Sequence, residues 1–432
     1  MSNLTDTSKG KQGKSTGSGS GPRPVESSDE APWTDRLRLD GSTTDPHIIP
    51  NLYNTMLILS EAPGWAGRIV YNENSRRVML RDHAPWGAAE WTGPRQWLDT
   101  DEILTAEWLE RVHHVTVSVS TVAQAVLGIA SLNPFHPIRD YLSSLDWDGE
   151  PRIDFWLSTC LGADHCDIVS AFGSKFLISA VARIFRPGCK VDTCLILEGA
   201  QGTLKSTALR ILFSDAWFTD QIPDVHNKDA SIQLDGKWLV EFSDLSQFEG
   251  AHASNREHLK AYLSRLTDCY RPVNGKQTID VPRQTVFAGT TNKQAWLSDD
   301  TGGRRFWPVK TGFINLDYLL AERDQLWAEA VERYKSGEKW HLNPQLDRLA
   351  RIEQAARHQT EPWQETVEDF IRGKRKVSSD AVLLHIKPKR SKWKQADKNQ
   401  IARCLNFAGW ERYNDHKDPA GRQKWMYRPK KD

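Results

Sequence analysis

Residues 194–213 have the sequence CLILEGAQGTLKSTALRILF. The apolar run at its start is typical of a buried parallel strand. The glycine-containing loop that follows leads into the apolar spacing of a helix, which predicts a strand, a phosphate-binding loop and a helix in succession. Strands and helices continue to alternate to about residue 310, and this alternation indicates an α/β fold.

The loop has the spacing of a Walker A motif, with Gly199, Lys205 and Ser206 at the expected positions. Glycines let backbone N–H groups surround a phosphate, and the start of the helix adds a partial positive charge. Lys205 would reach the β- and γ-phosphate oxygens, and Ser206 would bind Mg²⁺. Leu204 replaces the usual glycine before the lysine, so we expect Gly202 to supply the flexibility. The alternative, a chance glycine-rich turn, is disfavoured by the flanking strand and helix.

We therefore expect ATP and Mg²⁺ as ligands of this loop. The residues predicted to bind the nucleotide are Gly199, Gln201, Gly202, Thr203, Leu204, Lys205, Ser206 and Thr207.

Two later strands end in polar residues. The strand in KWLVEFSDL ends with Glu241 and Asp244, and P-loop ATPases direct such carboxylates to Mg²⁺ and to the attacking water. The sequence does not say which acid takes which role, except that Glu241 is the predicted second Mg²⁺ ligand. The strand in PRQTVFAGTTN ends with Asn292, which can position the lytic water. A solvated strand end and an ordinary asparagine turn are the plain structural alternatives.

A loop and a predicted hairpin each place basic residues beside glycines. Arg304 and Arg305 in TGGRRFWPV can act on a neighbouring subunit as arginine fingers, or they are surface charge. Asn274-Gly275 predicts a tight hairpin turn with Lys276 at its tip. A lysine there suits contact with a nucleic-acid backbone, although a solvated turn lysine explains it equally well.

Together these motifs resemble the virulence-associated protein E family, which comprises phage- and island-encoded ATPases similar to superfamily 3 helicases. The segments DYLSSLDWDGEPRIDFWL and LKAYLSRLTDCYRPVNGK extend the resemblance over roughly residues 33–307. The resemblance implies an AAA+-like P-loop core, a homo-oligomeric and often hexameric ring, and a role in replication. It places Glu241 and Asp244 in the Walker B segment, Asn292 at sensor 1, and Arg304 and Arg305 at the finger. Leu204 departs from the Gly-Lys step of the family.

The C-terminal part of the chain is strongly basic. From Arg372 onward it holds 18 Lys and Arg against 6 Asp and Glu, whereas the remainder holds 39 against 50. Three helical segments and a hairpin predict a winged-helix-like module, whose third helix would enter a DNA groove. A basic oligomerisation or lid module is the alternative. The residues expected to contact DNA, with the hairpin lysine included, are Lys276, Lys394, Lys398, Arg422, Lys424 and Arg428.

Composition excludes several other classes. Residues 1–32 are rich in Ser, Gly and Lys and are expected to be disordered, and they lack the apolar core of a signal peptide. No uninterrupted apolar run approaches the length of a membrane span. The six cysteines show no CxxC spacing, which favours reduced thiols in a cytoplasmic protein. The N-terminal region shows no paired acidic ligands of the kind that a primase needs.

The expected division is a tail at 1–32, a mixed α+β domain at 33–145, a P-loop ATPase domain at 146–345 and a basic DNA-binding module at 346–432. The sequence favours a DNA helicase or translocase of the superfamily 3 type, powered by ATP hydrolysis, in the replication of a phage, prophage or genomic island. DNA, single-stranded or origin duplex, is the expected partner, with phage or host replication proteins as further ones. The alternative is a nucleotide- and DNA-binding or replisome-interfering protein with little ATP turnover. The basic tail and the Gly-Gly-Arg-Arg loop disfavour a kinase of small metabolites.

Overall fold

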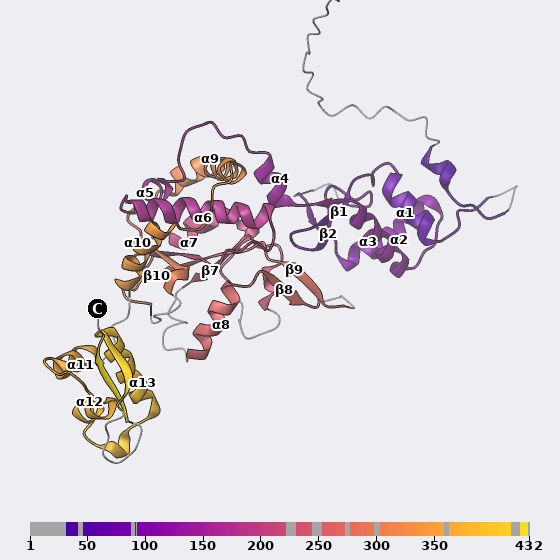
Figure 1. Ribbon diagram of the computed structural model, residues 1–432. Coiled ribbons are helices and arrows are strands. Elements are labelled where there is room, and N and C mark those ends of the chain that lie inside the picture. The colour runs from indigo at the N-terminus through magenta and orange to yellow at the C-terminus, as the bar shows by residue number, and fades with distance from the viewer. Residues whose placement is uncertain are drawn as a thin grey trace, which may run out of the picture. The chain divides into compact units, whose positions relative to one another are not determined.

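The computed structural model describes residues 32–41, 46–87, 91, 93–221, 230–243, 253–272, 277–297, 303–357, 363–415 and 424–430. Contacts between Cα atoms divide the chain into two compact units. The first unit comprises residues up to 72 together with 77–135, and the second comprises residues 73–76 and 136–432 (Figure 1).

The first unit combines a small sheet with three helices. Its strands lie in the order β3-β2-β1-β4, and β1 and β2 pair antiparallel as a hairpin. Trp65 and Trp108 pack edge to face in its core, with 5.8 Å between ring centroids. The elements are β1 (Ile69–Asn72), β2 (Arg77–Leu80), β3 (Arg95–Gln96), β4 (Pro134–Phe135), α1 (Leu52–Glu61), α2 (Asp99–His113) and α3 (Val119–Leu132).

The second unit is built on a five-stranded sheet with the order β11-β5-β10-β7-β6. Every neighbouring pair in it is parallel, which confirms the predicted α/β class. The strands are β5 (Cys194–Glu198), β6 (Phe218–Thr219), β7 (Leu239–Ser243), β10 (Val286–Thr291) and β11 (Phe306–Lys310). A separate antiparallel pair consists of β8 (Thr267–Tyr270) and β9 (Ile279–Pro282).

Both faces of this sheet are covered, which explains the continuous apolar runs of its strands. Leu195 and Leu197 belong to the core formed with α6, α7 and α9, whereas Cys194 and Ile196 belong to the core shared with α8. In Figure 1, α6 and α9 lie on one side of the sheet and α8 on the other. The helices of this unit up to the basic module are α4 (Pro137–Ser143), α5 (Trp156–Thr159), α6 (Asp167–Phe185), α7 (Lys205–Phe213), α8 (Ala253–Leu263), α9 (Leu316–Lys335) and α10 (Pro344–Ala355).

Helix α6 is the central helix of this core. By length and composition it could cross a membrane, but 78% of its most apolar window is buried inside the protein. Its polar residues Ser174 and Ser179 can be buried because their hydroxyls donate to carbonyls of their own helix. We therefore assign α6 as a core helix of a folded domain.

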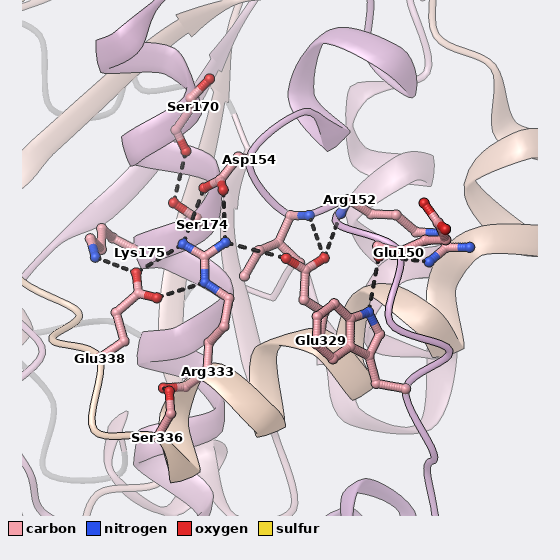
Figure 2. Close-up of polar contacts among 12 residues, drawn as sticks. Glu150, Arg152, Asp154, Ser170, Ser174, Lys175, Glu329, Arg333, Ser336 and Glu338 are labelled. Atoms are coloured by element: carbon pink, nitrogen blue, oxygen red, sulfur yellow. Dashed lines mark hydrogen bonds and ion pairs between the residues drawn. The ribbon is translucent and has the colours of Figure 1, made fainter.

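A polar network joins α6 and α9 to the segment before α5. The Arg333 guanidinium donates to the carboxylates of Asp154, Glu329 and Glu338. Glu329 in turn accepts the backbone N–H groups of residues 152 and 153, at 2.5 and 2.9 Å. Figure 2 shows these side chains converging on the Arg333 guanidinium. Lys175 of α6 also donates to the Glu338 carboxylate, so Glu338 connects α6 to Arg333 of α9.

The C-terminal residues form three helices and a hairpin. A bridge between Val377 and Tyr427 ties the hairpin to the segment between the first two helices. The predicted start of the basic module at residue 346 falls inside α10, whose Ala350 belongs to the core of the sheet. The elements after α10 are α11 (Gln364–Ile371), α12 (Ser379–Ile386), α13 (Gln395–Phe407), β12 (Trp410–Asp415) and β13 (Lys424–Pro429).

Candidate nucleotide-binding site

The strand order brings the predicted polar strand ends together. Because β10 lies between β5 and β7, the loop after β5 and the carboxyl ends of the other two strands meet at one edge of the parallel sheet. A pocket of about 550 Å³ lies there. It is lined by Gln201, Gly202, Thr203, Leu204, Lys205, Ser206, Thr207, Ser243, Thr290, Thr291 and Asn292.

The loop needs a left-handed backbone at two positions. Gly202 has φ +81°, as expected, but Leu204 also has φ +65° and ψ +17°. The expectation that Gly202 would replace the missing glycine is therefore wrong, because residue 204 keeps the glycine-like conformation and carries the steric cost of its Cβ. The Leu204 side chain is about half exposed, so it contributes little burial in return.

Gly199 is required for a different reason. A Cβ atom at this position would lie 2.7 Å from Thr311 Oγ1. Thr311 is held there because its N–H and hydroxyl both donate to the Glu198 carbonyl, at 2.8 and 2.9 Å. Gly199 thus allows the segment after β11 to pack against the base of the loop.

Lys205 lies across the loop in this structure. Its ammonium donates to the carbonyls of Gly199 and Ala200, at 3.0 and 2.7 Å, and to the Thr203 hydroxyl at 3.0 Å. The side chain is largely buried, and burial lowers the pKa of Lys205. The ammonium therefore hydrogen-bonds to neutral oxygens of the loop, an arrangement that leaves its charge available to an anion.

Glu241 is fully buried at the end of β7. Its Oε1 accepts hydroxyl protons from Ser206, at 2.6 Å, and from Thr290, at 2.7 Å. Its Oε2 has no hydrogen-bond partner among the described residues, and burial raises the pKa of this carboxyl group. A buried carboxylate oxygen without a donor, next to a serine hydroxyl, is a donor set that fits a hard divalent cation such as Mg²⁺. Ser206 and Glu241 are thus brought together as predicted.

Thr290 was not predicted as a site residue. This residue hydrogen-bonds to Glu241 from the neighbouring strand, and a threonine near a strand end gives no signal of such a role. Asn292 lines the pocket, as its place after β10 predicted. It also lines a second pocket of about 500 Å³ on the other side of the loop, together with Glu198, Lys310 and Arg357 among others.

The two arginines are not among the residues that line either pocket. Arg304 is exposed, and the Arg305 guanidinium donates to the Ser264 hydroxyl at 3.1 Å, after the end of α8. Their action on a neighbouring subunit stays a prediction. Asp244, Lys276 and Arg422 lie outside the described residues, as does the side chain of Lys424.

The predicted DNA contacts that can be described lie in the module of three helices and a hairpin. Lys394 is exposed at the start of α13. Lys398 is 3.1 Å from the Asp380 carboxylate, and Arg428 is 2.7 Å from that of Glu411. Lys394 is therefore the contact that DNA can reach without first separating one of these ion pairs.

The fold and the pocket define a class of protein with a parallel α/β sheet and a polar site at its carboxyl edge. The family model of the virulence-associated protein E-like domain matches residues 142–359, just over half of the chain. The chain belongs to this family, as its motifs predicted. The matched residues include the whole five-stranded sheet and the site.

Two solved structures are similar to the chain at low identity. One is the apo structure of the NrS-1 C-terminal region (305–718), with 12% identity, a TM-score of 0.45, and coverage of 84% of this chain and 96% of that one. The other is the A form apo structure of the same region, with 11% identity, a TM-score of 0.43, and coverage of 84% and 95%. Both TM-scores are too low to carry a property of those proteins over to this chain. No curated protein matches the sequence.

Proposed function

We propose that this chain is an ATP-dependent DNA helicase or translocase of the superfamily 3 type that acts in the replication of a phage, prophage or genomic island. The observation that carries the proposal is the buried Glu241 carboxylate, with one oxygen free beside the Ser206 hydroxyl. The family membership supports the replication context. The ATP turnover, the ring and the DNA substrate are all parts of the proposal.

The residues of the pocket divide the work of phosphoryl transfer. Lys205 would leave its loop carbonyls for the β- and γ-phosphate oxygens, where its charge stabilises the transferring group. Asn292 would orient the attacking water from the end of β10. Glu241, and Asp244 beyond the described strand, would supply the acidic pair, and Arg304 or Arg305 of a neighbouring subunit would stabilise the developing charge.

Mg²⁺ would be held by Ser206 and Glu241. Bound there, it neutralises charge on the phosphate oxygens. The hydrogen bond from Thr290 fixes the Glu241 side chain, so that its second oxygen is oriented in advance.

One observation favours the alternative of a binding protein with little turnover. Leu204 holds the loop in a strained conformation, and Lys205 is occupied by three oxygens of that loop. Nucleotide binding must break these contacts first. The alternative therefore predicts weak affinity for ATP and a function based on DNA binding alone.

The test is ATP hydrolysis by the full chain, with and without single-stranded DNA, for the wild type, Lys205→Ala and a control variant. Lys335→Ala, at the exposed end of α9, is a matched lysine outside the site. We expect Lys205→Ala to lose at least about 100-fold in turnover and the control to keep the wild-type rate. If the wild type hydrolyses ATP no faster than Lys205→Ala but still binds DNA, this would contradict the helicase or translocase and support the binding protein with little turnover.

DNA binding by the basic module is tested separately by its dependence on salt. Removal of one phosphate contact should reduce the slope of log K against log salt concentration by about 1. We expect this for Lys394→Ala and a smaller change for Lys398→Ala, because the Lys398 ammonium already pairs with Asp380. Equal slopes for Lys394→Ala and the wild type would remove Lys394 from the interface.

A further inference from the structure

A second buried carboxylate lies at the base of the phosphate loop. Glu198 is the last residue of β5 and directly precedes Gly199. Its carboxylate accepts two hydrogen bonds from the Arg357 guanidinium at Oε2, at 2.9 and 3.1 Å, and one at Oε1, at 3.0 Å. The Trp296 indole N–H donates to the same Oε1 at 2.7 Å. The carboxylate is thus bonded on both oxygens, unlike that of Glu241.

Arg357 also holds the chain that follows Asn292. Its backbone carbonyl accepts the N–H groups of Trp296 and Leu297, at 3.1 and 3.0 Å. The arginine lies just after the end of α10, and Glu353 of that helix pairs with its guanidinium. Arg357 therefore contacts both Glu198, at the start of the phosphate loop, and the backbone of residues 296 and 297, a few residues beyond Asn292.

We propose that Arg357 is a positioning residue that sets the phosphate loop and Asn292 in register through Glu198 and Trp296. This inference rests on the proposed ATPase function. Lys205 follows the loop, and Asn292 directly follows β10, so the contacts of Arg357 fix the distance between the groups that meet the γ-phosphate and the attacking water. A displacement of about 1 Å between such groups can cost about 100-fold in rate.

The geometry explains why the residue is an arginine. The planar guanidinium reaches both oxygens of Glu198 at once, whereas a lysine ammonium is a single point charge. A lysine would neutralise Glu198 but would not fix its orientation. Charge neutralisation and positioning can therefore be separated by one conservative variant.

The experiment compares steady-state ATP turnover of the full chain for the wild type, Arg357→Lys, Arg357→Ala, Glu198→Gln and the double variant Glu198→Gln with Arg357→Ala. Arg351→Ala is the matched control, because Arg351 lies on α10, shortly before Arg357, and its exposed guanidinium pairs with Asp347 of the same helix, away from the phosphate loop. Thermal unfolding is measured for each variant, so that rates are compared where all are folded.

We expect Arg357→Lys to keep most of the wild-type melting temperature and to lose about 30- to 100-fold in kcat, with KM within about threefold. Glu198→Gln should lose a similar factor, and the double variant no more than Arg357→Ala alone, because both residues act in one unit. The control should match the wild type.

Two results would overturn the inference alone: a kcat of Arg357→Lys within twofold of the wild type, or losses that multiply in the double variant. If the wild type shows no ATP turnover that depends on Lys205, the proposed function is overturned, and this inference with it. The two failures are therefore distinguishable in one set of assays.

Discussion

Glu329 and Glu241 are both buried carboxylates of the same unit, but they differ in their hydrogen bonds. Both oxygens of Glu329 are bonded, one to two backbone N–H groups and the other to Arg333. Glu241 has two hydroxyl donors on one oxygen and none on the other. Because an unpaired buried acceptor costs free energy, the first carboxylate stabilises the fold and the second is kept at a cost to it. This difference is the reason for proposing Glu241, and not Glu329, as the functional carboxylate.

The largest effect should come from Glu329. Glu329→Ala leaves the N–H groups of residues 152 and 153 without an acceptor in a buried site, and it removes one partner of Arg333. We expect the free energy of unfolding to fall by about 4 kcal/mol, measured by urea denaturation. Glu332→Ala, at an exposed position of the same helix, should change it by less than about 0.5 kcal/mol. If the two variants are equally stable, Glu329 does not stabilise the fold and does not differ from Glu241 in this respect.

The second effect concerns Glu241. Glu241→Gln removes a charge that has one oxygen unpaired, so the free energy of unfolding at pH 7 should stay level or rise by about 1 kcal/mol. ATP turnover should fall at least about 100-fold, because the amide is a poor ligand for Mg²⁺. A loss of several kcal/mol in stability would instead place Glu241 with Glu329, as a structural carboxylate.

A smaller effect is expected at Leu204. Leu204→Gly should raise the free energy of unfolding by about 1 kcal/mol, since glycine adopts the left-handed conformation without the Cβ clash. Leu204→Ala is the matched control, because it shortens the side chain and keeps the Cβ. A gain for alanine as large as that for glycine would mean that side-chain exposure, rather than the backbone, is the cost at this position.

The smallest effect is a pH dependence of stability that arises from Glu241. Burial raises the pKa of Glu241 in the folded chain, so the folded state binds the proton more tightly than the unfolded state. The stability of the wild type should therefore fall, relative to Glu241→Gln, as the pH rises from about 4.3, the ordinary pKa of a glutamate, through the higher folded pKa. Below that range the difference in stability between the two proteins should stay constant. Parallel curves from pH 4 to 8 would show that Glu241 titrates normally.

Much of the sheet could be predicted because its strands are continuous apolar runs next to recognisable loops. The strand before the phosphate loop, the acidic strand and the strand before Asn292 all lie where their sequences indicated. Glycine and lysine spacing also predicted the residues of the loop, and the family model that matches residues 142–359 is that of the family those motifs resemble.

The contacts between distant residues could not be predicted in the same way. The pairing of Glu198 with Arg357 joins residues 159 positions apart, and neither lies in a recognisable motif. Thr290 looks like any threonine of a buried strand. The left-handed conformation of Leu204 could have been inferred only by trusting the loop geometry over the residue type. The one signal in the sequence was that Glu198 ends an otherwise apolar strand, where a buried carboxylate needs a partner.

The order of the strands has a consequence for how the chain is made. β5 pairs with β10 and β11, and β7 pairs with β6 and β10, so β5 and β7 have no direct pairing with each other. During synthesis the loop and the acidic strand emerge from the ribosome well before β10, the strand that must be inserted between them. A nascent chain that stops before residue 286 can pair β6 with β7, but it has no strand that joins β5 and its loop to them. Such long-range pairing folds slowly, and we expect the newly made protein to depend on protection of its exposed strands until β10 is complete.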